Sequence, residues 1–223
     1  MCSNYEFPSK KRLSLLDIHE EQLELGMKTH IYPLAPAPII MRGADEYELD
    51  IARFGLIPTW AKELKYGRHT YNARTETVAS KSSFRHAWKN NQFALVPVDT
   101  FYEPKYIDGK PHWFGISRED SNPFTVAAIY DDAHIDGEKI RSFSMLTINS
   151  DQHPFMKQFH DPNDEKRSII VIPEKSRHDW LHCDHEQAHE FFFEMKDEFI
   201  AKPRDQRLLG NQKALNQVRA SSM

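Results

Sequence analysis

From residue 92 onward, short apolar runs alternate with turn residues, a pattern typical of antiparallel strands. The runs are rich in Val, Ile, Phe, Tyr and Thr, and they predict strands over residues 92–104, 112–118, 124–131, 141–150 and 168–173. Turn signals separate the first four runs at Asp108-Gly109, Ser121-Asn122-Pro123 and Asp136-Gly137. The second half of the chain is therefore expected to form a sheet of short strands joined by tight turns.

The first part of the chain combines helical and extended patterns. A helix is predicted over residues 10–30 by apolar residues at roughly helical spacing, namely Leu13, Leu16, Leu23 and Met27. Three prolines within 31–41 exclude a helix there and predict an extended entry into a strand. A hairpin is expected next, with its turn near residues 43–46 and its second strand over 47–54.

Helices are predicted in three further segments. The segment 72–89 is expected to end in a helix that carries Phe84 and Trp88 four positions apart, and helical patterns return over 174–183 and 185–200. Strands in one block with helices at the flanks indicate an α+β fold built on a curved, mostly antiparallel β-sheet or open barrel. The chain shows no internal repeat and no linker, so one domain over residues 1–223 is predicted.

Composition narrows the class of protein. The 223 residues are 39% hydrophobic and 12% aromatic, which is enough for a packed core. No run of about 18 apolar residues is present, and the N-terminal segment lacks the apolar stretch of a signal peptide. The two cysteines, Cys2 and Cys183, do not suggest a disulfide framework. We therefore expect a cytoplasmic protein without a membrane partner, in a reducing compartment that keeps the Cys2 thiol free.

Charge is unevenly distributed. Between residues 60 and 90 there are seven Lys and Arg against two Glu, a net charge of +5. The whole chain carries −4, so the remainder carries −9. A basic face on an acidic protein is compatible with a short phosphate-binding groove, and a solvated helix surface explains such a run equally well.

The chain begins Met1-Cys2. Cysteine is small enough for removal of the initiator methionine to be the ordinary outcome, which would make Cys2 the N-terminal residue. A terminal cysteine has a thiol and a free α-amine on adjacent carbons, and both have useful reactive fractions near neutral pH. Such a 1,2-aminothiol condenses with an aldehyde to an imine, which the thiol then closes into a thiazolidine ring. The alternative is a cysteine that stands at position 2 by chance.

Three further polar features are candidates for chemistry. Asn72 and Arg74 precede a predicted helix and could face a ligand at its entrance, although Asn72 could equally be a turn residue or cap. Glu103 ends an apolar strand among aromatic residues, which would favour its protonated form and suit a general acid; an edge position facing water is the alternative. His160 follows a strand and could act as a proton shuttle.

Taken together, these features resemble the SRAP family (SOS response-associated peptidase), whose members sense abasic sites in DNA. The resemblance runs from residue 1 to about residue 173, in the family order. It rests on Met1-Cys2, Leu34-Ala35-Pro36, Phe54-Gly55-Leu56-Ile57-Pro58-Thr59-Trp60, Asn72-Ala73-Arg74-Thr75-Glu76, Phe101-Tyr102-Glu103, Met145-Leu146-Thr147 and His160. Each motif is weak alone, and the ordered set is specific.

The resemblance implies covalent capture of abasic sites in single-stranded DNA through Cys2, with self-cleavage as the activity behind the peptidase label. It implies that Glu103 protonates the sugar ring oxygen, that His160 assists proton transfer, and that Asn72 holds the lesion or the Cys2 backbone. The DNA-contacting residues it suggests are Arg74, Trp60, Pro36, Thr147 and Arg167. A monomer without cofactor or bound metal is expected.

The chain departs from the family pattern at several positions. The opening reads Ser3-Asn4-Tyr5 where the family has Gly-Arg-Phe or Gly-Arg-Tyr, so one arginine is missing. The first Trp of the Trp-Gly motif is Phe54, and Arg167-Ser168 stands in for the Arg-Met-Pro start after an insertion. His153, seven residues before His160, is a competing candidate for the active-site histidine.

Two other functional classes remain open. The first is a cysteine-dependent protease without a DNA role, which the overall acidity favours. The second is a metal-binding or scaffolding protein built on the His-rich segment, where His178 and His182, and likewise His185 and His189, stand four positions apart. The basic 60–90 segment and Trp60 favour DNA over both.

Overall fold

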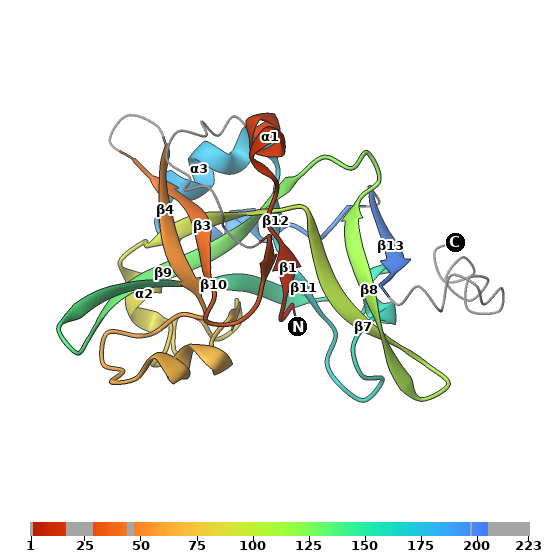
Figure 1. Cartoon of the computed structure of the whole chain (residues 1–223), viewed down its shortest axis with the longest axis horizontal. Coiled ribbons are helices and arrows are strands. Elements are labelled where there is room, and N and C mark those ends of the chain that lie inside the picture. Colours follow the sequence, from red (N-terminus) through yellow and green to blue (C-terminus); the bar gives the residue numbers. More distant parts are fainter. Residues whose placement is uncertain (1, 17–28, 44–46, 197, 205–223) are drawn as a thin grey trace.

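Two β-sheets carry most of the computed structural model, which describes residues 2–16, 29–43, 47–196 and 198–204. Figure 1 shows the strands of a barrel on the left and the strands β7, β8 and β13 on the right, with β1 and the N-terminus between them. The predicted α+β class with a curved, mostly antiparallel sheet is confirmed.

The larger sheet closes on itself. Its barrel strands are β3 (Pro36–Arg42), β4 (Tyr47–Phe54), β6 (Phe93–Val98), β9 (Phe124–Ile135) and β10 (Glu138–Asn149). They pair in the order β10-β4-β3-β6-β9, and the long β9–β10 hairpin completes the ring. All of these pairings are antiparallel except β10 with β4. Apolar side chains fill the core, among them Ile39, Phe54, Phe93, Leu95 and Phe143.

Three short strands extend this sheet beside β10 and β9. β5 (Asn72–Arg74) pairs in parallel with β10, and β11 (Arg167–Ile169) pairs antiparallel with the same strand. β12 (Val171–Ile172) pairs with β9. Residues far apart in the sequence therefore meet along β10.

The smaller sheet has the strand order β13-β8-β7-β1-β2. Its strands are β1 (Tyr5–Glu6), β2 (His30–Ile31), β7 (Thr100–Ile107), β8 (Lys110–Arg118) and β13 (Phe199–Pro203). β7 begins two residues after β6 ends, so one continuous stretch of chain joins the barrel to this sheet. The N-terminal strand is held at the junction by its pairing with β7.

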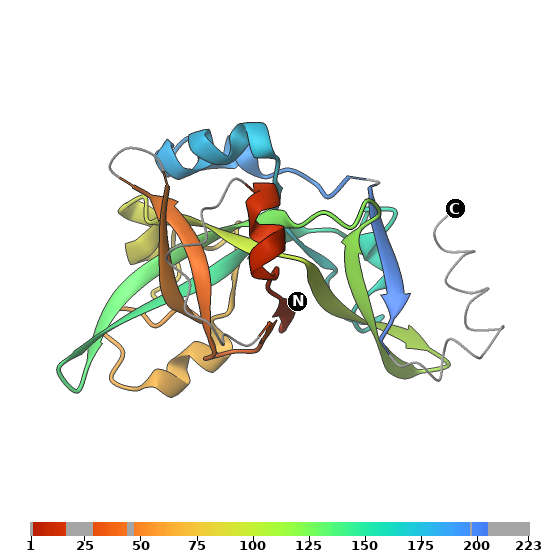
Figure 2. The same ribbon diagram turned by 45° about the horizontal axis from the view of Figure 1, so that its top comes forward.

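Short helices surround the sheets. These are α1 (Lys10–Leu13), η1 (Ser14–Leu16), η3 (Leu64–His69), α2 (Arg85–Lys89), η4 (Met156–Gln158), η5 (Glu174–Ser176), α3 (Arg177–His182) and η6 (Ala188–Phe191). Figure 2 shows α1 and α3 on the same side of the molecule. The fully buried Trp180 of α3 donates its Nε1–H to the Ala94 carbonyl on β6, which fixes the helix to the barrel. No helix among the described residues is long and apolar enough to cross a membrane.

A contact between two glycines shapes the segment that carries Trp60. Gly55 has a φ of 113°, and a Cβ atom there would lie 2.0 Å from the carbonyl oxygen of Gly67. Only glycine tolerates both that backbone conformation and that approach. The segment from residue 56 to 66, which ends in the first turn of η3, is therefore bounded by two glycines in backbone contact.

Most predicted elements are present, and two helices differ. The hairpin with strands up to residue 42 and from 47 to 54 is confirmed, as is the short helix over Arg85–Lys89. The predicted helix over 10–30 begins at Lys10, but residues 17–28 lie outside the described residues. The helix predicted over 185–200 is wrong, because this segment has one short turn, η6, before β13 begins at Phe199.

Candidate functional site

The four residues predicted to be catalytic meet at the junction of the two sheets. Cys2 lies just before β1, and the Tyr102 N–H donates to the Asn4 carbonyl at 3.2 Å, which continues the β1–β7 pairing toward the N-terminus. This pairing brings Cys2 close to Glu103 on β7. Cys2 is buried, and its Sγ lies 3.5 Å from the Asn4 carbonyl oxygen.

Asn72 holds the backbone of Cys2. Its Nδ2 donates to the Cys2 carbonyl oxygen at 2.8 Å. Its Oδ1 is buried and has no hydrogen-bond partner among the described residues. The structure corrects the predicted helix entrance, because Asn72 begins β5 and pairs with Met145 of β10. A fixed amide with an unused acceptor beside Cys2 can receive a hydrogen bond from an amine or a hydroxyl group.

Glu103 and His160 form a buried pair. Nδ1 of His160 lies 3.1 Å from Oε2 of Glu103, and Nε2 lies 2.9 Å from the Arg167 carbonyl oxygen. A carbonyl can only accept, so Nε2 must be the donor, and one proton must then lie between Nδ1 and the Glu103 carboxyl group. The pair therefore stores one proton a short distance from Cys2.

The positions of both residues refine the sequence prediction. Glu103 stands in the middle of β7 rather than at its end, and it is 2% exposed, which excludes the alternative of an edge residue facing water. His160 has a φ of 67°, an uncommon backbone conformation for a residue other than glycine, and its N–H donates to the Pro104 carbonyl at 2.6 Å. The loop thus holds the imidazole against β7.

Burial shifts the hydroxyl and thiol groups around Cys2 toward their protonated forms. Burial raises the pKa of the Cys2 thiol far above its ordinary value, and the nearby Glu103 carboxylate adds to this shift. Burial also raises the pKa of Tyr5 and of Tyr71, with the negative charge of a Cys2 thiolate contributing in both cases. Sequence reasoning missed both tyrosines, although Tyr71 directly precedes Asn72 and Tyr5 lies three residues after Cys2.

His153, the competing candidate, has a structural environment. Its Nε2 lies 2.6 Å from the Met195 carbonyl oxygen, and its Nδ1 accepts hydrogen bonds from the backbone N–H groups of Phe155 and Met156 at 3.1 Å. His153 therefore holds the start of η4 and ties it to the segment before β13. Glu103 has His160 as its partner.

Three of the predicted DNA contacts present exposed side chains. Pro36 and Arg74 are exposed, and Trp60 is 50% exposed. Arg74 lies at a pocket of about 290 Å³ whose lining also includes His160. Its Nη1 lies 2.7 Å from Oε2 of Glu165. Arg74 thus stands at the entrance to the histidine of the candidate site.

The other two predicted DNA contacts have buried side chains. Thr147 is 1% exposed, and its hydroxyl lies 3.5 Å from the Ala73 carbonyl oxygen. Arg167 is also 1% exposed, and its guanidinium group makes two 2.8 Å hydrogen bonds to Glu76 and one to Glu165. Arg167 still lines the pocket that contains Arg74 and His160, and contact of either residue with DNA stays a prediction. In the structure Arg167 holds the two glutamates in place beside Arg74.

We predict that Arg167→Met destabilises the fold by roughly 3 kcal/mol, because it removes a buried cation that two carboxylates and the Thr147 carbonyl share. Arg118→Met is the matched control, since Arg118 pairs with Asp120 and Glu198 on a more exposed surface and should cost less than about 1 kcal/mol. Urea unfolding followed by circular dichroism measures both. Equal losses for the two variants would contradict the assigned role of Arg167.

The His-rich segment has separate partners for its imidazoles. His182 Nδ1 lies 2.8 Å from the His178 carbonyl oxygen, His185 Nδ1 lies 3.0 Å from Asn91 Oδ1, and His189 Nδ1 lies 2.7 Å from the Glu186 carbonyl oxygen. Within the described ranges, no group of three or more His, Cys, Asp and Glu side chains is placed to hold a metal ion. This finding concerns a metal site alone, and a scaffolding role of the segment stays a hypothesis.

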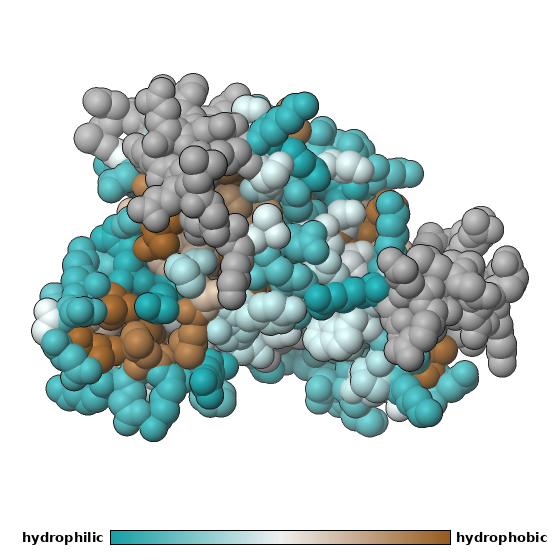
Figure 3. Space-filling view, viewed as in Figure 1, coloured by the Kyte–Doolittle hydropathy of each residue, from teal (hydrophilic) through white to brown (hydrophobic). Residues whose placement is uncertain are grey.

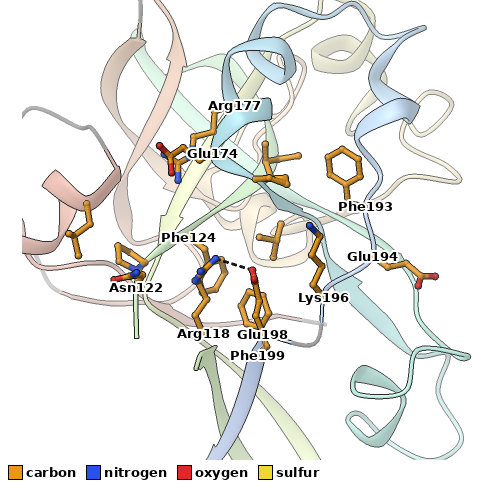
Figure 4. A pocket seen from close by; sticks show the side chains of 15 residues that line it. Arg118, Asn122, Phe124, Glu174, Arg177, Phe193, Glu194, Lys196, Glu198 and Phe199 are labelled. Carbon is orange, nitrogen blue, oxygen red and sulfur yellow. Dashed lines mark hydrogen bonds and ion pairs between the residues drawn. The ribbon is translucent and has the colours of Figure 1, made fainter. Parts of the chain in front are cut away.

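A second cavity of about 300 Å³ lies between the start of β9, β12 and β13 (Figure 4). Its described lining includes Phe124 and Phe199, with the Arg118–Glu198 ion pair at 2.9 Å across it. Arg177 reaches it from α3, but its guanidinium group is buried and donates to the Leu16 carbonyl and Thr125 hydroxyl oxygens. None of the nine predicted site residues is among its described lining residues.

The fold and the site define a β-barrel protein in which a cysteine near the N-terminus lies beside a buried Glu–His pair. The family model described as "SOS response associated peptidase (SRAP)" matches residues 1–208, and the chain belongs to this family. The match extends 35 residues beyond the resemblance seen in the sequence, which ended near residue 173.

Named relatives and solved structures agree with this assignment. The chain is 30% identical over 155 residues to the abasic site processing protein YoqW of Bacillus subtilis (strain 168), covering 67% of this chain and 66% of the relative. It is 28% identical over 153 residues to the abasic site processing protein YedK of Escherichia coli (strain K12), covering 67% and 64%. The chain thus spans just under two thirds of the length of these relatives.

A crystal structure of a protein from Bordetella bronchiseptica superposes with a TM-score of 0.83 at 28% identity, covering 91% of this chain and 99% of that one. A crystal structure of a protein from Bacteroides thetaiotaomicron superposes with a TM-score of 0.72 at 19% identity, covering 96% of both chains, and this likeness concerns the fold alone.

Proposed function

We propose that this protein captures abasic sites in single-stranded DNA by forming a thiazolidine between Cys2 and the lesion, after Met1 has been removed. The observation that carries the proposal is the position of Cys2, whose backbone is held by Asn72 and whose side chain lies near the Glu103–His160 pair. The names of the relatives, which are abasic site processing proteins, support the same substrate.

The chemistry follows from the groups at the site. The α-amine of Cys2 attacks the aldehyde carbon of the ring-opened deoxyribose, and loss of one water gives an imine. The sulfur then adds to the imine carbon, while the thiol proton passes to the nitrogen. Because the thiolate is the nucleophilic form and the pKa of the buried Cys2 thiol is raised, the proton has to leave the sulfur within the site as the bond forms.

The Glu103–His160 pair supplies the proton transfers. Its stored proton can reach the ring oxygen of the closed sugar and promote opening, and the pair can protonate the hydroxyl group that leaves as water. Oδ1 of Asn72 can accept a hydrogen bond from the attacking amine, which orients its lone pair toward the aldehyde. Arg74 contacts the adjacent phosphate, and the exposed ring of Trp60 offers a stacking surface for a neighbouring base.

Intact-protein mass spectrometry with and without abasic single-stranded DNA tests the proposal. The free protein should lack Met1, and the adduct should have the summed mass of protein and DNA minus one water. An imine has the same mass, but borohydride adds two hydrogens to an imine and none to a thiazolidine. A protein that keeps Met1, or that gives no adduct at any pH from about 5 to 8, contradicts the proposal.

A cysteine-dependent peptidase is the second candidate function, and the family description favours it. An N-terminal nucleophile can use its own amine as the base. The two functions differ in what they require, because the peptidase should release a peptide in the absence of DNA. The same mass spectra, recorded over time without DNA, separate them.

We predict that Glu165→Gln raises the affinity for single-stranded DNA about two- to fivefold. Glu165 forms an ion pair with the guanidinium group of Arg74, and a DNA phosphate has to displace this carboxylate in order to bind there. Arg74→Glu should lower the affinity and reduce the slope of log affinity against log salt by about 0.7. Glu198→Gln, which removes a carboxylate from the surface pair with Arg118, is the matched control and should leave binding unchanged. Fluorescence anisotropy at several salt concentrations measures all three variants, and tighter binding by the control alone would contradict the prediction.

A further inference from the structure

One face of the smaller sheet carries a ladder of aromatic rings. The Tyr102 and His30 rings lie 5.2 Å apart at an interplanar angle of 12°, and the His30 and Tyr32 rings lie 4.7 Å apart at 6°. Tyr102 is on β7, His30 is on β2, and Tyr32 directly follows β2. Tyr102 is buried at the inner end of the ladder, whereas Tyr32 at the outer end is 48% exposed. The ladder therefore ends in a ring that solvent reaches.

Strand alternation places this ladder on the opposite face of β7 from Glu103. Successive side chains of a strand point to opposite faces, so Glu103 points one way while Tyr102, Pro104 and Tyr106 point the other. The β8 residues opposite these positions add to the same face, because Gly115 pairs with Tyr102, and Trp113 pairs with Pro104.

The residues next to Tyr102 leave the aromatic face of the smaller sheet uncovered. A Cβ atom at Gly115 would lie 3.2 Å from the Tyr102 ring, so glycine leaves room for that ring to lie across the strand. Trp113 is 38% exposed on the same face. Two separate aromatic surfaces, Tyr32 and Trp113, are thus accessible on this side of the sheet.

A cation lies on the ladder without an acidic partner. The Arg204 guanidinium carbon lies 4.5 Å from the centre of the Tyr102 ring, and its Nη2 lies 3.4 Å from the Tyr32 hydroxyl group. Among the described residues, Arg204 has no carboxylate within ion-pair distance. Lys202, exposed on the neighbouring strand and paired with Gly115, adds a second positive charge. Stacking surfaces beside unpaired cations are the features that bind unpaired nucleotides.

Burial also keeps the middle ring of the ladder neutral. The pKa of His30 is lowered by partial burial and by the nearby charge of Arg204, and its Nε2 is hydrogen-bonded to Asn4 Oδ1 at 3.0 Å. Among the described residues, the acid beside the ladder is Glu6, which accepts the Tyr102 hydroxyl hydrogen at 2.5 Å and lies 3.9 Å from His30. Its side chain is 39% exposed, so these two contacts only partly screen its charge.

This face reaches the pocket beside His160, although Cys2, Asn72 and Glu103 are not among the described residues that line that pocket. Pro104 and Tyr106, which follow Tyr102 on the same side of β7, line the pocket that contains Arg74 and His160. Along β7 the ladder residue Tyr102 and the pocket residue Pro104 are therefore two positions apart. In the space-filling view of Figure 3 the visible surface over β7 and β8 is mostly pale or hydrophilic, unlike the apolar patches that protein partners cover.

We propose that the outer face of the smaller sheet binds the single-stranded DNA next to the lesion, with bases stacked on Tyr32 and Trp113 and phosphates contacted by Arg204 and Lys202. This inference rests on the proposed function and extends it, since it gives the strand a path from the pocket across the sheet. The surface reads no base edge, so binding is expected to tolerate any sequence.

Anisotropy titrations with undamaged, labelled oligothymidylates of two lengths test this path. An oligomer of about 4 nucleotides fills the pocket region alone, whereas one of about 16 also covers the sheet face. Tyr32→Ala and Arg204→Ala should each weaken binding of the longer oligomer roughly tenfold and of the shorter one less than about twofold. Tyr32→Phe keeps the ring and should retain the affinity of the wild type.

Matched controls are available on other elements. Tyr47→Ala removes a tyrosine of similar exposure, 38%, from β4, and Lys175→Ala removes an exposed cation from η5. Both should bind the two oligomers like the wild type. A measurement that needs no variant is the fluorescence of 2-aminopurine moved along the longer oligomer, which should be quenched at the bases that stack on the sheet.

The outcomes separate this inference from the function on which it rests. If Tyr32 and Arg204 variants bind the longer oligomer as tightly as the wild type, or no 2-aminopurine position is quenched, the path is wrong even if the protein forms adducts. If the wild type binds the longer oligomer through this face but forms no adduct with abasic DNA, the inference stands and the proposed chemistry falls. Absence of any binding to single strands removes the inference outright.

Discussion

Replacing Cys2 by alanine is expected to abolish formation of a stable adduct with abasic single-stranded DNA. The variant keeps the α-amine but has no sulfur to close the ring. Cys2→Ser should form an imine that borohydride traps, again without a stable ring. Cys183→Ala is the matched control: Cys183 is also a buried, free cysteine, and burial raises the pKa of its thiol to about 12, but it has no α-amine. Its removal should leave the adduct yield unchanged.

Denaturing gel electrophoresis with labelled DNA measures the adduct yield of each variant. A variant with extra residues before Cys2 has no free Cys2 amine. It should form as little adduct as Cys2→Ala, because the thiol alone cannot form the imine. Stable, borohydride-independent adducts with Cys2→Ala would mean that another residue carries the chemistry. Adducts with the extended protein would mean that the amine is not required.

Local patterns in the sequence predicted much of the fold. Strand alternation and turn residues located the β9–β10 hairpin, whose turn at Asp136-Gly137 has positive φ values at both residues. The prolines of the 31–41 segment predicted the extended chain that becomes β3. These signals are short-range and depend only on neighbouring residues. Closure of the barrel by β10 could not be predicted in this way, because the parallel pairing of Phe54 with Phe143 joins residues 89 positions apart.

The failed helix over 185–200 shows how packing can override a local pattern. Its alternating charged and apolar residues fit a helical period, but three consecutive phenylalanines, Phe191, Phe192 and Phe193, cannot share one helix face. In the structure Phe191 packs on Trp180 and Phe192 on Trp88. The chain therefore follows the outside of the core instead of coiling.

The sequence predicted the candidate catalytic residues but not the ion pairs around them. Cys2, Asn72, Glu103 and His160 belong to motifs that resemble a known family, and the structure brings them together. The burial of Arg167 depends on where Glu76 lies, 91 positions away, so no local pattern could show that its charge is already neutralised. The same holds for Glu165, whose contact with Arg74 crosses the mouth of the pocket.

The site gathers groups that can donate protons. Burial raises the pKa values of Cys2, Tyr5 and Tyr71, and Nδ1 of His160 lies 3.1 Å from the Glu103 carboxyl group. A site that must protonate a sugar oxygen and release water needs donors more than bases. The raised pKa values also make the stability of the fold depend on pH. The folded state binds the Cys2 and Tyr5 protons more tightly than the unfolded state, so stability should fall as pH rises past the ordinary pKa values of these groups.

Glu103→Gln is expected to slow adduct formation by about 10²–10⁴-fold while leaving non-covalent DNA binding nearly intact. Glutamine keeps the shape and can donate a hydrogen bond to Nδ1 of His160, but it cannot release a proton as a carboxylic acid does. His160→Ala should be similarly slow, because the shared proton then has no second site.

His153→Ala is the informative control: it removes the hydrogen bonds that start η4, so it should lower the melting temperature and leave the rate per folded molecule unchanged. Single-turnover cross-linking at saturating DNA, across pH from about 5 to 8, measures all three variants. A slow His153→Ala with a normal His160→Ala would exchange the two histidines, and normal rates in all three would remove acid–base catalysis from the mechanism.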